Sequence, residues 1–326
     1  MLTKKRVLRI LTCLLLISAL FVTGCAKKSG EQENGPNPVT ETDRLVETLV
    51  REQSLYLNCI ALEGLASYSL TKILYEQPSI KENIVFEYTI FNDWNLIFKA
   101  IENNEASLAI VPFKMAIEML LNTDTYQLAG AVKGNSHVML GASKWDEIIG
   151  KEIVIYDPSG LNGKFETTAD RLAFKLEQMN IYRDKDYTVS YTQKLELPTG
   201  NQIFAMEDIY LKLDIFAQVG PYLSLDESDD YQLALLIDKS IVEINPDIIR
   251  SFADEYYRAC AWLSSYPERA IAYSEQLKIT SEKIPARGLY YFKASKIIDP
   301  IVDMLMVLGY DEYSIERIEK SIYTFD

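Results

Sequence analysis

Few side chains of this 326-residue chain are of the kinds that catalyse reactions or bind metal ions. The sequence contains one histidine, His137, and four cysteines, with no Cys-x-x-Cys pair and no His-Glu-x-x-His motif. A structural zinc site usually takes four His or Cys ligands, and a serine triad needs a histidine beside its nucleophile. We therefore expect no metal site, no catalytic residues and no cofactor, and we interpret His137 as a surface or packed imidazole.

Two proline-containing turns are the best candidates for binding a ligand. Residues 106–120 read ASLAIVPFKMAIEML and residues 212–225 read KLDIFAQVGPYLSL, so each has a short apolar run that stops at Pro112 or at Pro221. Proline fits the first turn of a helix because that position needs no N–H donor. The other free N–H groups at a helix start can bind an anionic or polar group. Either turn alone fits an ordinary strand–helix junction, and their repetition suggests one shared site.

Strands and helices alternate around these turns. Apolar or alternating runs predict strands at residues 55–61, 84–91, 107–111, 152–156, 187–191 and 214–219. Helical patterns are found at residues 68–75, 93–103, 113–121, 166–179 and 200–211. This βαβαβ order predicts a mostly parallel sheet covered by helices. We expect residues 136–142 and 231–237 to cross between two lobes, and the chain after residue 245 to be helical and to pack on the first lobe.

The first 24 residues are typical of an export signal. Four basic residues precede an apolar run at residues 10–22, and small residues follow it directly before Cys25. The run is shorter than the roughly 20 apolar residues that span a bilayer. It resembles a bacterial lipoprotein signal, which implies that residues 1–24 are removed and that Cys25 carries the lipid. An ordinary signal peptide, or an uncleaved anchor with a chance cysteine, is the alternative.

The rest of the chain predicts a linker and two lobes. Residues 25–48 are mostly polar and have no apolar period at their start, so we interpret them as a flexible linker. The remaining body of about 280 residues exceeds the usual size of a single core. We assign residues 49–137 plus 238–326 to lobe 1 and residues 138–237 to lobe 2.

The acidic excess narrows the range of partners. The whole chain has a formal charge of −14, and without the four basic residues of the signal 29 Lys and Arg face 47 Asp and Glu, a charge of −18. Such a surface repels nucleic acid and anionic lipid, so the lipid must attach the protein to the membrane. We expect Cys59 and Cys260 to be buried free thiols, with a disulfide between them as the alternative in an oxidising compartment.

Several motifs in a fixed order carry a family resemblance. They are Ala-Leu-Glu-Gly at residues 61–64, the strand and proline at 106–112, Ile-Gly-Lys-Glu-Ile-Val at 149–154, the run at 214–221 and Trp-Leu-Ser-Ser-Tyr-Pro-Glu-Arg-Ala at 262–270. Over roughly residues 50–310 the chain resembles the type II periplasmic-binding-protein fold. Within that fold it is similar to the substrate-binding lipoproteins of nitrate, taurine and aliphatic-sulfonate ABC importers and to their thiamine-precursor relatives. The resemblance implies two α/β lobes joined by a hinge of two segments.

In an open α/β sheet a ligand binds outside the carboxyl ends of the strands. The candidate ligand-binding residues stand at such ends: Glu63, Gly64, Leu65, Ser67, Asp93, Trp94, Val111, Pro112, Ser159, Gly160, Asn162, Gly163, Gly220 and Pro221. Bland alternatives remain for some of them. Ser67 could be only a helix cap, the glycine-rich turn at 159–163 could be a plain turn, and Trp94 could pack in the core instead of stacking on a flat ligand.

The chain departs from its relatives at the first of these turns. They often carry Lys-Gly-Pro-Thr-Gly where residues 63–67 read Glu-Gly-Leu-Ala-Ser. A carboxylate at that place repels a sulfonate or a nitrate unless it is turned away or paired. The ligand therefore stays open among sulfonate, nitrate, a neutral or heteroaromatic solute such as a pyrimidine, and others.

The resemblance implies a function in transport. We expect a monomeric binding protein, lipid-anchored on the extracytoplasmic face of the cell membrane, that captures a small polar or heteroaromatic solute between its lobes. The solute would pass to the permease of an ABC importer. The alternatives are an enzyme on the same fold, similar to a thiamine-pyrimidine synthase or a menaquinone-pathway lyase, and a sensor lipoprotein that binds a ligand for signalling.

Overall fold

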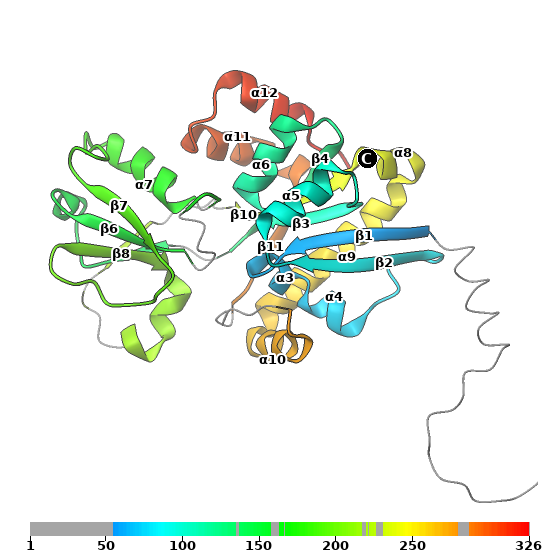
Figure 1. Cartoon of the computed structure of the whole chain (residues 1–326), viewed down its shortest axis with the longest axis horizontal. Helices are drawn as coiled ribbons and strands as arrows, with labels where there is room; N and C mark the ends of the chain where they lie inside the picture. Colours follow the sequence, from blue (N-terminus) through cyan, green and yellow to red (C-terminus); the bar gives the residue numbers. More distant parts are fainter. Residues whose placement is uncertain are drawn as a thin grey trace, which may run out of the picture. The chain divides into compact units, whose positions relative to one another are not determined.

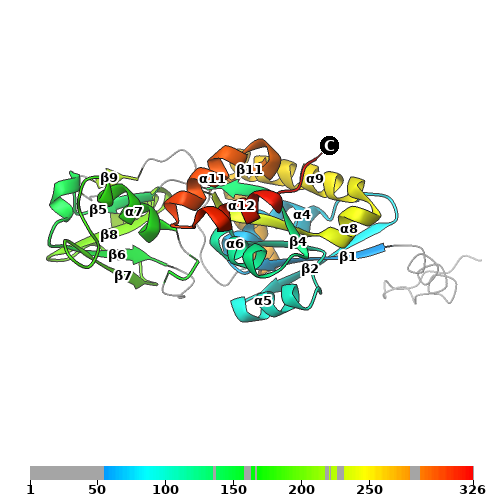
Figure 2. The ribbon, with the colours of Figure 1, turned by 90° about the horizontal axis from the view of Figure 1, so that it is seen from above.

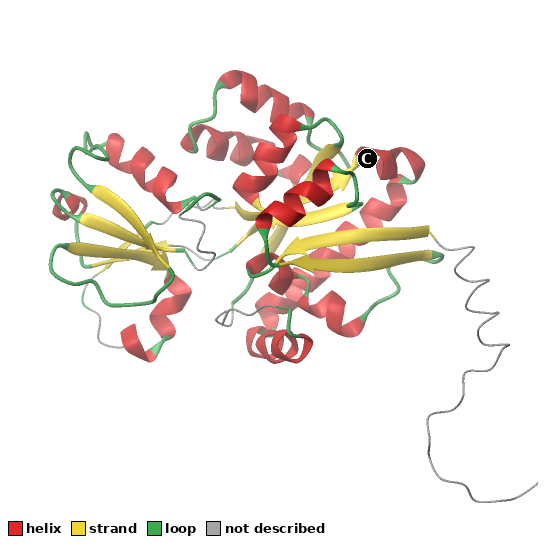
Figure 3. Cartoon of the chain, viewed as in Figure 1, coloured by secondary structure: helices red, strands yellow, loops and turns green. Residues whose placement is uncertain are grey.

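Two β-sheets organise the part of the chain that the computed structural model describes, which is residues 55–134, 137–157, 163–165, 167–216, 220, 222–225, 231–279 and 287–325 (Figures 1 and 3). The first sheet has six strands in the order β11-β4-β10-β3-β1-β2, and the second has five in the order β7-β6-β8-β5-β9. The first consists of β1 (Leu55–Leu62), β2 (Ile84–Phe91), β3 (Leu108–Pro112), β4 (Tyr126–Lys133), β10 (Tyr231–Asp238) and β11 (Tyr290–Lys293). The second consists of β5 (His137–Leu140), β6 (Glu152–Tyr156), β7 (Thr188–Thr192), β8 (Gln202–Glu207) and β9 (Tyr222–Ser224).

The two sheets repeat one pattern of strand pairing. In the first sheet β2, β1 and β3 are parallel and β10 lies antiparallel to β3. In the second, β7, β6 and β8 are parallel and β5 lies antiparallel to β8. The strand β8 is therefore the counterpart of β3. Between the described strands the chain passes from one sheet to the other twice, from β4 to β5 and from β9 to β10.

Helices cover both faces of the first sheet because its central strands are apolar on both sides. On β3, Ala109 and Val111 face one cluster of buried side chains while Leu108 and Ile110 face another. The first cluster includes side chains of α5 (Trp94–Glu102), α6 (Phe113–Asn122), α11 (Ile298–Val307) and α12 (Glu312–Lys320). The second includes side chains of α3 (Leu65–Ser69), α4 (Thr71–Glu76), α9 (Pro246–Ser265) and α10 (Pro267–Leu277). In Figure 1, α6, α11 and α12 lie above the first sheet and α3, α4 and α10 below it.

The remaining helices are short or belong to the second sheet. They are α7 (Thr168–Glu177), α8 (Lys239–Ile244) and the 3-10 turns η1 (Trp145–Ile148), η2 (Asp208–Lys212), η3 (Asp214–Phe216) and η4 (Ala294–Lys296). Side chains of α7 fill one face of the second sheet, and those of η2 and η3 fill the other. The end of the chain returns to the first sheet beside α9, where Tyr323 joins the same cluster as Phe252 and Tyr256 (Figure 2). No helix among the described residues is long and apolar enough to cross a membrane.

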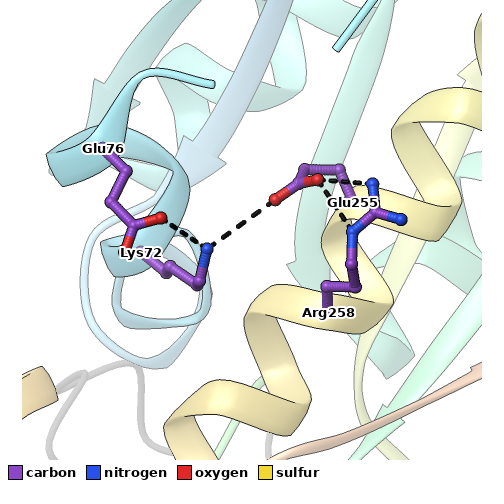
Figure 4. A network of polar contacts seen from close by, with 4 residues as sticks. All are labelled: Lys72, Glu76, Glu255 and Arg258. Atoms are coloured by element: carbon purple, nitrogen blue, oxygen red, sulfur yellow. Dashed lines mark hydrogen bonds and ion pairs between the residues drawn. The ribbon is translucent and has the colours of Figure 1, made fainter. Parts of the chain in front are cut away.

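A polar network holds α4 against α9 (Figure 4). The Lys72 ammonium lies 2.5 Å from the Glu76 carboxylate and 3.9 Å from that of Glu255. The Arg258 guanidinium donates two hydrogen bonds to the same Glu255 carboxylate, at 2.6 and 3.0 Å. Because Glu255 is 8% exposed, these two cations stabilise a carboxylate that would be costly to bury alone.

Most of the strands and helices predicted from the sequence are confirmed, and two are wrong. The pattern predicts a helix at residues 200–211, but these residues form β8 and most of η2. It predicts a strand at residues 214–219, but this segment begins with η3. The four central residues of β8 are buried, and an apolar run that is buried on both faces has no alternation to distinguish it from a helix.

Several expectations about the connections are also corrected. Residues 137–140, expected within a crossing, form β5 of the second sheet. Residues 231–237, expected as a crossing and counted with the second lobe, form β10 of the first sheet. The strand β4 was not predicted, and β11 interrupts the helices expected after residue 245. That C-terminal segment does pack on the first sheet, as predicted, because β11 pairs with β4. Cys59 and Cys260 are buried free thiols, also as predicted.

Candidate functional site

The ends of β1 and β2 lie side by side and carry the first group of candidate residues. The last residues of the two strands, Leu62 and Phe91, are paired, and the Glu63 N–H donates to the Phe91 carbonyl at 2.7 Å. Gly64 then turns the chain with φ 103°, which L side chains rarely adopt. Ser67 is fully buried, accepts from the Gly64 N–H at 3.1 Å and donates to the Gly64 carbonyl at 3.0 Å. The Ser67 hydroxyl thus closes this turn and starts α3.

The helix α5 begins at the end of β2 and presents Trp94. Asp93 caps it, because its carboxylate accepts from the Asn95 N–H at 2.8 Å. The predicted start of this helix is confirmed. The Trp94 ring packs partly against the first buried cluster, and the rest of it is exposed.

The end of β3 lies on the same edge of the first sheet. Pro112 is its last residue and directly precedes α6, so the predicted strand–proline–helix junction is confirmed. Val111 is fully buried, so its side chain lies in the core, whereas Leu65 and Pro112 are half-buried. In the first turn of α6, the Lys114 ammonium lies 2.6 Å from the Asp170 carboxylate of α7, which belongs to the second sheet.

The turn after β6 reaches Trp94 from the second sheet. Asp157 is 3% exposed and accepts from the Gly163 N–H at 2.8 Å. Gly163 has φ 73°, and a Cβ there would lie 2.2 Å from the Tyr191 ring. Phe165 is 8% exposed and joins the first buried cluster, with its ring centroid 5.6 Å from that of Trp94. Residues 163–165 therefore bring the second sheet into contact with the end of β2.

The end of β8 makes another contact between the two sheets. Its last residue, Glu207, forms an ion pair with Arg287, which lies shortly before β11 of the first sheet. Arg287 is 4% exposed, and its guanidinium also lies 3.4 Å from the Tyr210 hydroxyl. The Arg287 carbonyl accepts from the Tyr68 hydroxyl of α3 at 3.2 Å. Burial lowers the pKa of the Arg287 guanidinium, but the Glu207 carboxylate together with Tyr210 and Tyr68 holds that pKa above its ordinary value.

Sequence reasoning missed Glu207, Tyr210 and Arg287. It placed the second strand end at residues 219–221, whereas the counterpart of β3 ends at Glu207. Gly220 is exposed, and β9 follows it at the edge of the second sheet, away from the parallel strands. The predicted residues Ser159, Gly160, Asn162 and Pro221, and the lipidation site Cys25, lie outside the described residues. If residues 202–207 had been assigned to a strand, the end of that strand would have pointed to Glu207.

Known structures identify the fold that positions these residues. The chain aligns with an ABC transporter structure from Parabacteroides distasonis at TM-score 0.59 and 16% identity, over 80% of this chain and 94% of that one. It aligns with the periplasmic aliphatic sulphonate binding protein of Escherichia coli at TM-score 0.58 and 12% identity, over 82% and 92%. A Candida albicans protein with the generic periplasmic binding protein fold aligns at TM-score 0.50 and 11% identity, over 82% and 95%. The chain has the periplasmic-binding-protein fold. No family model and no curated protein matches the sequence.

The periplasmic-binding-protein fold explains why the strand ends of the two sheets are candidate ligand-binding places. In this fold class the parallel strands of each half end toward the ligand. Here Phe165, which follows β6, packs against Trp94, which follows β2. Glu207 at the end of β8 forms an ion pair with Arg287, which precedes β11. These places offer two aromatic rings, several charged groups and the N–H groups at helix starts. No group of three or more His, Cys, Asp and Glu able to hold a metal ion occurs among the described residues. The arrangement is suited to binding a small molecule.

Proposed function

We propose that the chain is a solute-binding protein that captures a small polar or heteroaromatic solute between two α/β lobes and delivers it to an ABC importer. The observation that carries the proposal is the contact of the strand-end segments of the two sheets on a periplasmic-binding-protein fold, through Trp94 and Phe165 and through Glu207 and Arg287. The neighbours support the transport role, since one is named an ABC transporter and another a periplasmic sulphonate binding protein.

The mechanism follows from two lobes that are joined by two segments. A ligand that contacts both lobes stabilises the closed form over the open form by its difference in affinity for the two. Each lobe would move as a unit, because the chain passes between the two sheets twice, from β4 to β5 and from β9 to β10. The permease would then bind the closed form. Glu63, Gly64, Leu65, Asp93, Trp94 and Pro112 would form one wall, with Gly163 and the end of β8 opposite them.

We further propose that lipid at Cys25 tethers the body to the extracytoplasmic face of the membrane through residues 25–48. The support is the basic and apolar pattern of residues 1–24. Labelling cells with radioactive palmitate tests it, because the wild-type chain should carry label and fractionate with membranes. A Cys25→Ser chain should do neither. Label that persists in Cys25→Ser would refute this anchor and leave the binding function untouched.

A thermal-shift screen tests the binding function. The chain that starts at Ala26 is heated with sulfonates, nitrate, bicarbonate, pyrimidines and riboflavin, each in turn. A solute at 100 times its dissociation constant adds about 2.7 kcal/mol to the free energy of unfolding. Trp94→Ala should weaken the thermal shift. The control Trp262→Ala should leave the shift unchanged, because Trp262 stacks on Tyr273 between α9 and α10. Absence of any shift, together with turnover of a metabolite, would favour an enzyme on this fold.

A further inference from the structure

The turn at residues 163–165 places a positive charge on an aromatic surface. The Lys164 ammonium lies 3.5 Å from the centroid of the Trp94 ring and 5.1 Å from that of the Phe165 ring. The two rings meet at 71°, so they form a corner that contacts the ammonium from two sides. The negative face of an indole ring attracts cations within about 6 Å of its centroid. The corner therefore has the geometry of a cation-binding site.

Lys164 reaches this corner without help from a carboxylate. Among the described residues its ammonium makes no ion pair and no hydrogen bond, although the chain has a large excess of Asp and Glu. Lys72 and Lys114, by contrast, lie 2.5 and 2.6 Å from carboxylate oxygens. Lys164 is exposed, so burial does not force it onto the ring either. The attraction of the rings for a cation is the remaining physical reason for its position.

The turn that carries Lys164 has a defined position. The turn itself is held in place at both ends, by the hydrogen bond from Gly163 to Asp157 and by the burial of Phe165.

We propose that the corner of Trp94 and Phe165 binds the ammonium group of the transported solute, and that Lys164 occupies it when no solute is present. The inference rests on the proposed function and deepens it by naming a ligand class, a small organic cation with a primary or quaternary ammonium. On binding, the solute cation takes the place of the lysine ammonium. The Lys164 side chain can leave because it is exposed and unpaired among the described residues.

A substitution that removes only the competing cation tests this. Lys164→Ala deletes the atoms from Cγ to Nζ, which correspond to propylammonium. Propylammonium and tetramethylammonium should bind Lys164→Ala at least about fivefold more tightly than wild type, as measured by calorimetry and by quenching of tryptophan fluorescence. Neutral 1-propanol and anionic propanesulfonate, of matching size, should show no such gain. A second substitution, Trp94→Leu in the Lys164→Ala chain, should abolish the binding of both cations.

The chain offers a matched control. The Lys175 ammonium lies 4.8 Å from the Trp145 ring centroid, so Lys175→Ala removes a similar contact outside the proposed site. It should leave the affinity for both cations unchanged. Circular dichroism confirms that each variant is folded before binding is measured.

Two results would overturn the inference. Failure of Lys164→Ala to bind either cation would show that the rings do not accept a free ammonium. Binding of propanesulfonate by wild type that is lost in Lys164→Ala would show that the lysine is the counter-charge of an anion. In the second case the proposed function stands, because a solute still binds. Failure of the proposed function is recognised separately, by the absence of a shift for wild type throughout the thermal screen when propylammonium and tetramethylammonium are included in it.

Discussion

The ion pair between Glu207 and Arg287 joins the two sheets, and its loss should destabilise the protein measurably. Arg287 is 4% exposed, and the Glu207 side chain keeps 17% of its exposure. In Glu207→Gln the guanidinium keeps its charge but loses its counter-ion. Breaking a buried pair by removing one partner costs about 3–5 kcal/mol. Because the carboxylate retains some contact with water, and glutamine can still accept a hydrogen bond, we expect about 3 kcal/mol.

Urea unfolding followed by circular dichroism measures this change in the chain that starts at Ala26. The midpoint should fall while the slope stays constant, since the surface exposed on unfolding is the same. The exposed pair of Arg317 and Asp124, with side chains 33% and 87% exposed, provides the control. Arg317→Met should cost less than about 1 kcal/mol.

A double substitution separates the contribution of charge to stability from the contribution of side-chain packing. Glu207→Leu combined with Arg287→Met removes both charges and keeps apolar side chains of similar length. It should recover most of the stability lost in Glu207→Gln, because no uncompensated charge stays buried. The reasoning is refuted if Glu207→Gln costs no more than the exposed Arg317→Met control, or if the double variant is less stable than Glu207→Gln.

Three further predictions concern backbone, thiols and pH. Gly163→Ala should destabilise the chain and weaken solute binding, because Gly163 has φ 73° and a Cβ there would lie 2.2 Å from the Tyr191 ring. In the control Gly200→Ala, φ is 57° but the new Cβ would have no atom of another residue within 4 Å, so urea unfolding should show a smaller loss of stability. Burial raises the pKa of the thiols of Cys59 and Cys260, so a thiol reagent should label neither in the native chain that starts at Ala26 and both after unfolding. Burial raises the pKa of Tyr310 from 10.0 to about 12, so the contribution of Tyr310 to stability is present below pH 10.0 and is lost as the pH rises through 12. The urea midpoint of Tyr310→Phe should therefore fall less than that of the wild type over this pH range.

The sequence predicted those elements whose burial leaves a visible pattern. The strand β2 alternates half-buried and exposed residues, and Asp93 marks the start of the following helix, so both were recognised. The strand β8 has no exposed residue to mark its period, and it was mistaken for a helix. Because of that error, the strand end of the second sheet was expected at Pro221 instead of Glu207. An apolar run buried on both faces carries too little information to fix its conformation without the neighbouring strands.

The contacts of the site could not be predicted in the same way. Arg287 lies 80 residues from Glu207 in the sequence, and the pairing of β11 with β4 brings its segment to the first sheet. Trp94 was predicted either to stack on a ligand or to pack in the core, and its ring is partly packed while a cation lies on its face. Such contacts depend on the tertiary arrangement, which no local pattern encodes.

The repeated strand order has different chemistry in its two halves, and this difference bears on specificity. The strand β3 ends at Pro112, followed by a helix start without a side-chain cap, so the first sheet offers backbone N–H groups there. Its counterpart β8 ends at Glu207, whose charge is compensated by Arg287. A charged solute gains little from groups that already compensate each other. Lys164, which has no carboxylate partner among the described residues, is therefore the group whose replacement should change ligand preference most.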